Sequence, residues 1–488
     1  MPDDAYAGLE PPELWRHFAA LNRIPRAPGN EAGAREYVRS VAERAGSEFV
    51  ADARGNALVR VAARPGRERA VTVAVQAHLD MVCESAPGVD FDFDRDPIVT
   101  QRDGDTISAR ETTLGADNGI GVAAALALLS TPDLPCGPLE LLFTIEEETG
   151  LHGALALDAS LLRARSMINL DSEDDEALTV GCAGGADVAL SFELEREPLA
   201  PGWSCAELSV SGLTGGHSGV QIHEHRANAI KLLVTAIDRL RAGGVELRLI
   251  SLDGGSAHNA IPLDASAHLA IVDGAIARAH ELTAALVAEL DREWRADEPG
   301  ISIELSDVQR PPHEAASAPA SATLVSLLRE LPHGVIAISD EFPGVVATSI
   351  NLALASTDAA RVDVLTSIRS VSAERLDAVA SRVKALAAAS GASAELTGGY
   401  PGWEPRRDSP IAAAAAAAYQ RVYARRPKIE IVHGGLECGA LVAKLPDLDV
   451  VSFGPLIREA HTPREHVYAS TVASTWNVLV SLLDALSN

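Results

Sequence analysis

The chain has 488 residues, more than the roughly 250–300 at which a single hydrophobic core stops growing, so we expect at least two domains. Apolar residues make up 47% and charged residues 22%, the composition of an ordinary globular protein. The 68 Asp and Glu outnumber the 41 Lys and Arg, and the net charge of -27 repels nucleic-acid phosphates and anionic membrane surfaces. We therefore expect neither a nucleic-acid nor a membrane partner.

The amino-terminal segment "MPDDAYAGLEPPELWRHF" carries acidic residues where a secretory signal carries basic ones, and no apolar stretch long enough to span a membrane follows it. The cysteines are odd in number, scattered and without a CxxC pair: Cys83, Cys136, Cys182, Cys205 and Cys438. This usage predicts neither a disulfide framework nor a thiolate zinc finger, and it favours the reducing cytoplasm as the location.

Residues 1–188 have the rhythm of an α/β domain, in which helices alternate with short strands. The segment "NEAGAREYVRSVAERAG" has helical periodicity. The β-rich runs predict strands at Val71 to Val75, Leu139 to Ile145 and Met167 to Leu170. This part of the chain therefore predicts a sheet covered by helices.

Residues 189–399 have a different pattern and predict an inserted α+β domain. A turn-rich segment is followed by the strand "AELSVSGL", the loop "TGGHSG" and the helix "ANAIKLLVTAIDRLRAG". The Pro/Ala/Ser-rich segment "VQRPPHEAASAPASAT" predicts a break. Strands near "VVATSINLALAS" and "DVLTSIRSV" come next, and Ser372 is the expected N-cap of the helix after them.

In residues 400–488 the first rhythm returns. Ser409 and Pro410 form an N-cap and N1 pair for the helix "IAAAAAAAYQRVYARR", and the strand "LDVVSFG" precedes a final apolar helix. The simplest fold is one α/β domain, a mixed sheet flanked by helices, that the second domain interrupts.

Polar side chains follow the apolar runs that we expect to form the sheet. In open α/β sheets the carboxyl ends of the strands form the binding crevice, so these side chains are expected to converge on one site. They are His78 and Asp80 after "VTVAVQA", Glu146, Glu147 and Glu148 after "LELLFTI", Asp171 after "MINL", His461 after "DVVSFGP", and Asp117 in the Gly-flanked turn "TTLGADNGIG".

Carboxylates and imidazoles without thiolates are the ligands of zinc, manganese or cobalt. The candidate residues come from five segments, and five ligands, one from each segment, are more than one tetrahedral zinc uses. Two ions ~3.5–4 Å apart that share a carboxylate would use all five and hold a hydroxide between them. Any one of these strand-end residues could equally be a helix cap or a solvated loop residue.

The chain resembles a known family in nine motifs that occur in order. They are "QAHLDMV", "TTLGADNGIG", "IEEETG", "INLDSED", "GCAGG", "GLTGGHSG", "HNAIP", "GLECG" and "SFGP" followed by "HTP". These motifs are similar to those of the aminoacyl-histidine dipeptidases, also called Xaa-His or cytosol non-specific dipeptidases, of the di-zinc clan that includes carnosinases, aminoacylases and glutamate carboxypeptidase. The similarity extends from "IPRAPGNE" to "HTPREHV", nearly the whole chain.

The resemblance implies a zinc-peptidase-like catalytic domain with an inserted lid domain, and two divalent metal ions, with Zn²⁺ favoured and Mn²⁺ or Co²⁺ as alternatives. It implies that His78 and Asp171 bind one ion, that Glu148 and His461 bind the other, and that Asp117 bridges the two. Asp80 would orient the His78 ring. Glu147 would be the general base that takes a proton from the attacking water and passes it to the leaving amine. A cis peptide is expected after Asp117.

The resemblance also implies groups that recognise a small peptide. His217 would stabilise the oxyanion, Arg369 and Asn259 would bind the substrate carboxylate, and Glu437 would meet the free ammonium. Three of these have alternative interpretations: His217 as a loop histidine, Arg369 as a surface ion-pair partner and Glu437 as a structural cap. The sequence departs from the family pattern at three positions, namely His258 in place of Arg, Glu111 in place of Gly, and Thr149 in place of a small apolar residue.

These features predict a cytoplasmic metallodipeptidase of broad specificity, with Xaa-His and carnosine-like peptides as candidate substrates. An N-acyl amino acid deacylase or an aminotripeptidase on the same scaffold is the alternative enzyme. A catalytically silent metal-binding homologue is a third interpretation, which the complete set of ligand residues disfavours. Dimers occur in this clan, so a homodimer is a further expectation.

Overall fold

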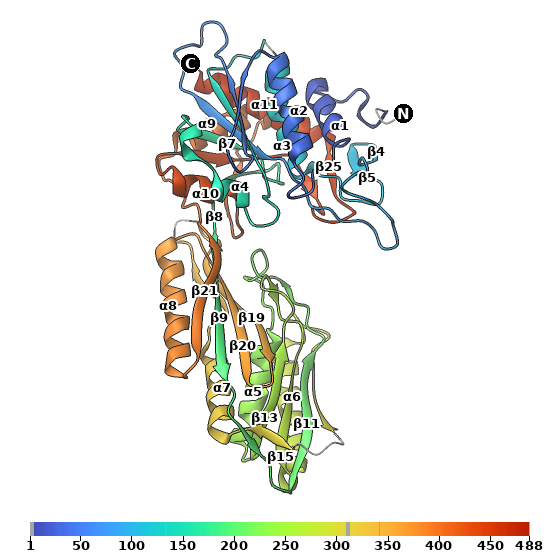
Figure 1. Ribbon diagram of the computed structural model, residues 1–488, viewed down its shortest axis with the longest axis vertical. Coiled ribbons are helices and arrows are strands. Elements are labelled where there is room, and N and C mark those ends of the chain that lie inside the picture. The colour runs from blue at the N-terminus through green and yellow to red at the C-terminus, as the bar shows by residue number, and fades with distance from the viewer. Residues whose placement is uncertain (1–3, 132, 309–312, 341, 488) are drawn as a thin grey trace. The chain divides into compact units, whose positions relative to one another are not determined.

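The chain folds into two units in the computed structural model, which describes residues 4–131, 133–308, 313–340 and 342–487 (Figure 1). Unit 1 comprises Met1–Cys182 and Gly402–Asn488, and unit 2 comprises Ala183–Pro401. The second unit is therefore an insertion into the first. The inserted unit runs from Ala183 to Pro401 in the structure, whereas the sequence predicts an insertion at residues 189–399.

Unit 1 is built on an eight-stranded mixed sheet with the order β1-β2-β6-β3-β7-β23-β8-β22. Strands β3, β6 and β7 are parallel to one another, and β23 is parallel to β7, whereas β2 pairs antiparallel with β6. The strands are β1 (Glu48–Ala51), β2 (Ala57–Val61), β3 (Val73–His78), β6 (Leu139–Thr144), β7 (Ser166–Asn169), β8 (Ala177–Cys182), β22 (Lys428–Val432) and β23 (Asp449–Ser452). This mixed sheet confirms the expected α/β fold.

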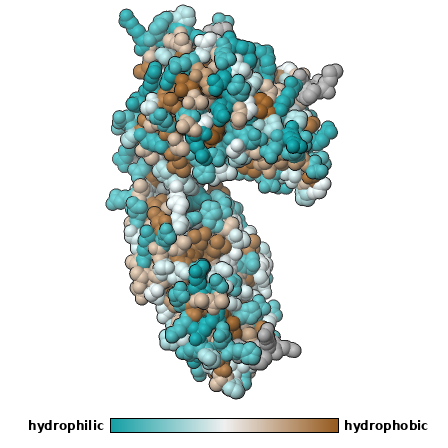
Figure 2. Space-filling view, viewed as in Figure 1, coloured by the Kyte–Doolittle hydropathy of each residue, from teal (hydrophilic) through white to brown (hydrophobic). Residues whose placement is uncertain are grey.

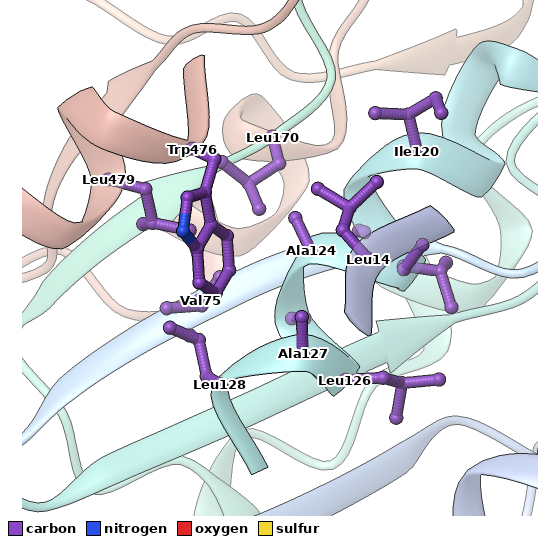
Figure 3. Close-up of a cluster of buried hydrophobic side chains, with 14 of the residues drawn as sticks. Leu14, Val75, Ile120, Ala124, Leu126, Ala127, Leu128, Leu170, Trp476 and Leu479 are labelled. Atoms are coloured by element: carbon purple, nitrogen blue, oxygen red, sulfur yellow. The ribbon is translucent and has the colours of Figure 1, made fainter. Parts of the chain in front are cut away.

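Helices cover both faces of this sheet, so its central strands are buried on both sides and are mostly apolar. Alternate residues of β3 enter opposite cores, since Val73, Val75 and Ala77 pack in one hydrophobic cluster and Ala74 in another. Figure 3 shows part of the first cluster, in which Val75 lies with Leu14, Ala124 and Trp476. The helices of unit 1 are α1 (Pro12–Leu21), α2 (Ala32–Arg44), α3 (Ala116–Ser130), α4 (His152–Ala156), α9 (Pro410–Tyr423), α10 (Glu437–Lys444) and α11 (Ala469–Leu486), with short 3₁₀ turns η1 (Asp4–Tyr6) and η2 (Ala159–Leu161).

Helix α3 has no polar face, because every residue from Asn118 to Leu129 is buried. A helix that is apolar all round belongs in the interior of a domain. Its packing against α1 and β3 fixes the position of its first turn, which carries Asp117. A small sheet, β24-β25-β5-β4, completes unit 1, with β4 (Thr100–Asp103), β5 (Thr106–Ala109), β24 (Ile457–Arg458) and β25 (His466–Tyr468).

Unit 2 contains an antiparallel sheet with the order β16-β11-β15-β13-β19-β20-β9-β21, and β18 also pairs with β19. Four helices pack on it around a hydrophobic core that is separate from those of unit 1. The helices are α5 (Ala229–Ala242), α6 (Ile276–Trp294), α7 (Ala318–Glu330) and α8 (Ala373–Ala389), with the 3₁₀ turn η3 (Asp273–Ala275). The sheet strands are β9 (Gly184–Glu193), β11 (Trp203–Ser211), β13 (Leu247–Gly254), β15 (Ala265–Val272), β16 (Ser302–Val308), β18 (Gly334–Ile338), β19 (Val346–Thr357), β20 (Arg361–Ser370) and β21 (Ser393–Tyr400). Two small ladders join β10 (Arg196–Pro198) to β17 (Glu314–Ala316), and β12 (Gly216–His217) to β14 (Ala260–Ile261).

The face seen in Figure 2 mixes hydrophilic residues with smaller groups of hydrophobic ones. Exposed large apolar side chains occur on strand β18, at Val335, Ile336 and Ile338. In the part of the chain that the structure describes, no helix combines the length and the apolar character needed to cross a bilayer.

Two expectations for local structure are corrected. The strand expected at Val71 to Val75 runs instead from Val73 to His78, because Val71 is 62% exposed while all six residues of β3 are buried. The segment 308–323 is not simply a break: residues 309–312 lie outside the described ranges, but β17 follows them and Ser317 caps α7 through the Ala320 amide. The N-cap Ser409 is confirmed, since its hydroxyl accepts the Ala412 amide at the start of α9.

Candidate active site

The polar residues selected from the sequence lie at one edge of the unit 1 sheet. Because β3, β6 and β7 are parallel, their carboxyl ends meet at the same edge. His78 is the last residue of β3, the three glutamates follow β6 after Ile145, and Asp171 comes two residues after β7 ends. Asp117 reaches this edge from the first turn of α3, whose N-cap Gly115 adopts the left-handed conformation (φ +68°).

Asp117 is shared between two histidines. Its Oδ1 lies 3.1 Å from His78 Nε2, and its Oδ2 lies 3.1 Å from His461 Nε2. Each histidine has a second carboxylate neighbour: Asp171 Oδ1 is 3.2 Å from His78 Nε2, and Glu148 Oε2 is 3.2 Å from His461 Nε2. The five side chains therefore form two halves of a site, joined by the two oxygens of one carboxylate. The peptide after Asp117 is cis, as expected.

Asp80 connects His78 to the glutamates. Its Oδ1 lies 3.4 Å from His78 Nδ1, and its two oxygens accept the backbone amides of Glu147 (3.1 Å) and Glu148 (3.0 Å). A carboxylate on the far ring nitrogen fixes the orientation of an imidazole. The same carboxylate also holds the turn that carries the two glutamates, a role that the sequence did not suggest.

The three consecutive glutamates have different surroundings. Glu146 adopts a left-handed backbone (φ +49°) and forms an ion pair with Arg54, away from the histidines. Glu148 faces His461, and its Oε1 is buried without a hydrogen-bond partner among the described residues. Burial raises the pKa of the Glu147 carboxyl well above its usual value; the His78 charge opposes this, and the Asp171, Glu437 and Glu148 charges add to it.

The electrostatics of the site favour cations. Hydrogen bonds to Asp117 and Glu148 raise the pKa of His461 to about 11, and burial raises the pKa of Asp171 to about 6. Burial also acts to raise the pKa of Asp117, but hydrogen bonds from His461 and His78 hold it below its ordinary value. Several carboxylates thus share the site with the buried imidazole of His78 and the half-exposed imidazole of His461, and divalent cations would neutralise the excess negative charge.

The residues present fit a pair of metal ions. Nitrogen and oxygen ligand atoms of His78, Asp117 and Glu148 all lie within 4.8 Å of one another. The unpartnered Oε1 of Glu148 and the divided oxygens of Asp117 are the features that a two-ion site with a bridging carboxylate requires.

Glu437 begins helix α10 and is completely buried in unit 1. Its Oε2 accepts hydrogen bonds from Gln76 Nε2 and Thr144 Oγ1, both at 2.6 Å, and burial raises its pKa to about 8. Its Oε1 has no hydrogen-bond partner within the described ranges. Gln76 and Thr144 lie in β3 and β6, so Glu437 lies near the same sheet edge as the histidines.

The remaining candidates lie together in unit 2. The ladder between β12 and β14 places His217 opposite Ala260, and Ser218 donates its amide to the Asn259 carbonyl (2.8 Å). Partial burial lowers the pKa of His217, and the nearby charges of Arg369 and His258 lower it further. Arg369 donates from Nη1 to the Tyr400 hydroxyl at 3.0 Å.

The three departures from the family pattern have separate structural settings. Glu111 adopts φ +64°, a left-handed conformation that glycine adopts most easily, which accounts for the expectation of Gly there. His258 pairs with Asp187 across 3.3 Å, and Thr149 is exposed.

Two buried charged residues of unit 1 were not selected from the sequence. Arg26 and Glu465 contact the backbone of the turn that precedes Asp117. They lie in "IPRAPGNE" and "HTPREHV", the segments that mark the two ends of the family resemblance. Their place in these two segments is the only sequence signal described above that points to Arg26 and Glu465.

The family model of peptidase family M20/M25/M40 matches residues 74–485. The chain belongs to this family. It is accordingly a metallopeptidase, and enzymes of this family hold two metal ions. The resemblance drawn from the nine motifs is confirmed.

Individual relatives agree with this assignment. The cytosol non-specific dipeptidase of Escherichia coli (strain K12) is 39% identical over 478 residues, which cover 97% of this chain and 98% of the relative. The crystal structure of an aminoacylhistidine dipeptidase from Vibrio alginolyticus is similar with a TM-score of 0.92 and 36% identity, covering 99% of both chains. An aminopeptidase from Bacillus cereus, 17% identical, shares the fold with a TM-score of 0.57 over 98% of this chain and 100% of that one.

Proposed function

We propose that this metallopeptidase hydrolyses dipeptides that have a free amino terminus. The observation that carries the proposal is the sharing of the two Asp117 oxygens between His78 and His461, with Glu147 beside them. The full-length similarity to a curated dipeptidase supports the same substrate class. Xaa-His and carnosine-like peptides are the candidates to test first.

We assign His78 and Asp171 to one ion, His461 and Glu148 to the other, and Asp117 to both. When bound, the two ions supply Lewis acidity, which polarises the scissile carbonyl and lowers the pKa of water. A nitrogen and oxygen ligand set suits Zn²⁺, and Mn²⁺ or Co²⁺ are compatible with it.

Glu147 carries the proton in this mechanism. Its carboxylate takes a proton from the attacking water and then donates it to the nitrogen of the leaving amine. The raised pKa of this buried carboxyl helps it to hold the proton between the two steps. Asp80 supports the step, because it binds the Glu147 amide and faces the His78 ring.

Charged groups recognise the two ends of the substrate. Arg369 and Asn259 bind the carboxylate, and His217 donates to the developing oxyanion. Glu437 meets the free ammonium, whose positive charge would favour the ionised form of this buried carboxyl; its unpartnered Oε1 supports this role. A requirement for a free amine distinguishes a dipeptidase from a deacylase, so Glu437 favours the first.

The test is an activity panel on protein loaded with Zn²⁺, Mn²⁺ or Co²⁺. The substrates are Ala-His, Leu-Gly, β-Ala-His, a tripeptide and N-acetyl amino acids. We expect cleavage of the dipeptides and little cleavage of the acetylated compounds. Cleavage of the acetylated compounds alone would identify a deacylase, and preference for the tripeptide would identify an aminotripeptidase.

We also infer that the protein acts in the cytoplasm. All five cysteines are free thiols, and four of them are buried. Cell fractionation tests this location, and recovery of the protein with the secreted fraction would contradict it.

A further inference from the structure

We propose that Glu465 and Arg26 are positioning residues that hold the metal-ligating segments in register. The inference rests on the proposed two-ion site and adds to it two buried charges that bind no metal. Each contacts the backbone of residues 114–117, the turn that presents Asp117.

Glu465 binds this turn through four backbone amides. Its Oε2 accepts from Leu114 (2.8 Å) and Gly115 (3.0 Å), and its Oε1 accepts from Ala116 (2.7 Å) and Asp117 (3.3 Å). The residue is only 2% exposed. Such convergent amides compensate a buried carboxylate for its lost hydration.

Glu465 also lies in the loop that supplies His461, four residues after that histidine. Its four hydrogen bonds therefore connect the His461 loop to the Asp117 turn. Because His461 and Asp117 lie 3.1 Å apart, this connection sets the spacing of two ligands that come from distant parts of the chain.

Arg26 makes the corresponding connection on the other half of the site. Its Nη1 donates to the carbonyls of Leu79 (3.1 Å) and Asp80 (2.9 Å), which follow His78, and its Nη2 donates to the Gly115 carbonyl (2.5 Å). One planar guanidinium thus ties the end of β3 to the Asp117 turn.

The glycines of "LGADNGIG" leave room for this arginine. A Cβ atom at Gly115 would lie 2.3 Å from Arg26 Nη2, and one at Gly119 would lie 2.7 Å from it. Both glycines are thus explained by the close approach of Arg26, in addition to the positive φ of Gly115.

Unit 1 offers a matched control in Glu140, the second residue of β6. This glutamate is also 2% exposed, its Oε2 accepts the amides of Arg163 (2.8 Å) and Ala164 (2.9 Å), and its Oε1 accepts from Arg60 Nε (3.3 Å). It lies at the amino end of β6, whereas the proposed metal ligands follow the carboxyl end. Glu140→Gln therefore reports the effect of losing a buried, amide-bound carboxylate without disturbing the site.

The experiment titrates chelator-treated full-length protein with Zn²⁺ by calorimetry and measures bound zinc after dialysis. Thermal unfolding of each variant accompanies the titration. We expect Glu465→Gln to weaken zinc binding roughly 10- to 100-fold, the usual effect of losing a group that orients metal ligands. Glu140→Gln should lower Tm and keep wild-type zinc affinity.

Conservative variants separate positioning from folding. Glu465→Asp keeps the charge and should recover part of the affinity lost in Glu465→Gln, and Arg26→Lys should weaken binding because one ammonium cannot reproduce the planar fork. Wild-type affinity and stoichiometry in both Arg26→Lys and folded Glu465→Gln would overturn the proposal, as would an equal loss of affinity in Glu140→Gln. If Glu465→Gln does not fold, Arg26→Lys and Glu465→Asp decide the outcome by the same criterion.

The result is independent of the substrate. Wild-type protein that binds two zinc ions but cleaves no dipeptide would reject the proposed activity and leave this inference standing. Wild-type protein that binds no zinc, manganese or cobalt would overturn the inference itself.

Discussion

Glu147 and Glu148 are neighbours in the chain to which the proposed mechanism gives two different roles. Asp80 holds both backbone amides, so the turn that carries the two side chains is fixed. Glu148 Oε2 lies 3.2 Å from His461, as the proposed shared ion requires, whereas Glu147 lies among the buried acidic groups and has a raised pKa.

Replacing these two glutamates should therefore have different effects. Glu147→Gln should keep both metal ions and lower kcat roughly 10²- to 10⁴-fold, because it removes the proton carrier and no ligand. Glu148→Gln should lose metal. Metal analysis together with steady-state kinetics checks both variants. Metal loss in Glu147→Gln, with retention in Glu148→Gln, would mean that the roles are reversed.

At the scale of elements, three strands of unit 2 bring Arg369 and Tyr400 together. Gly185 of β9 pairs with Arg369 of β20 on one side and with Tyr400 of β21 on the other. The two outer side chains meet across this glycine, and a Cβ at position 185 would lie 2.8 Å from two atoms of the Tyr400 ring. A residue with no side chain is thus needed between them.

Gly185→Ala should displace Tyr400 and remove the hydroxyl partner of Arg369. A hydrogen bond to a charged group contributes about 1.5–3 kcal/mol, so we expect KM for dipeptides to rise roughly tenfold, with a smaller change in kcat. Tyr400→Phe, which removes the hydroxyl without crowding, should act in the same way. Kinetics on a dipeptide and its carboxamide provide the measurement, since the carboxamide lacks the carboxylate and should be little affected. An unchanged KM in both variants would show that Arg369 does not bind the substrate carboxylate.

Three helices of unit 1 meet at His17 of α1. Its Nδ1 contacts the Tyr37 hydroxyl of α2, and its Nε2 contacts the Ser130 hydroxyl at the end of α3, both at 2.8 Å. Burial lowers the pKa of His17 from 6.5 to about 4, and the charges of Arg16 and Arg44 add to the effect. The folded protein therefore keeps this ring neutral.

This histidine should contribute a pH dependence to the stability of unit 1. Between pH 6.5 and 4 the unfolded chain binds the proton more readily than the folded chain. The contribution of His17 to the free energy of unfolding is therefore fully present above pH 6.5 and is lost as the pH drops toward 4. The slope reaches at most about 1.4 kcal/mol per pH unit. Denaturant unfolding followed by the fluorescence of buried Trp15 should show this slope in the wild type and its loss in His17→Gln. The same substitution at exposed His152 serves as the control, and equal slopes in wild type and His17→Gln would contradict the assignment.

Local signals in the sequence predicted the ends of β6 and β7 to within one residue, whereas β3 extends three residues beyond the predicted end at Val75. An apolar run that stops at a histidine or an acidic residue is visible within about ten positions, and His78 and Asp171 were found in this way. The contacts of Glu465 were not predictable, because they join residues 348 to 351 positions apart and only the folded chain brings them together. The assignment of His217 and Arg369 likewise depended on family resemblance, since neither follows a strand of the catalytic sheet.

At the scale of the whole molecule, the insertion leaves and re-enters unit 1 at adjacent points. The backbones of Cys182 and Trp403 exchange two hydrogen bonds, at 3.0 and 2.9 Å, as an isolated antiparallel bridge. The cores of the two units are formed by separate sets of residues. Each unit thus has the requirements for folding by itself.

Replacing residues 183–401 by a short Gly/Ser linker should therefore give a folded protein that still binds two metal ions. Its kcat/KM for dipeptides should fall at least about 10²-fold, because the proposed oxyanion donor His217 and the proposed carboxylate-binding Arg369 would be absent, and one oxyanion donor alone contributes roughly 10²–10³. Circular dichroism, metal analysis and kinetics test this design. Near-normal turnover in the shortened chain would show that unit 1 holds the entire substrate site.

The position of β23 in the middle of the unit 1 sheet has a consequence for protein synthesis. Since β23 lies between β7 and β8, the ribosome must translate the whole insertion before the sheet can close. At roughly 5–20 residues per second, this delay lasts on the order of tens of seconds, during which unit 2 can fold first. The nascent chain exposes the edge of β7 throughout that interval and still lacks His461. With the proposed ligands, the peptidase therefore completes its metal site only when its own translation is nearly finished.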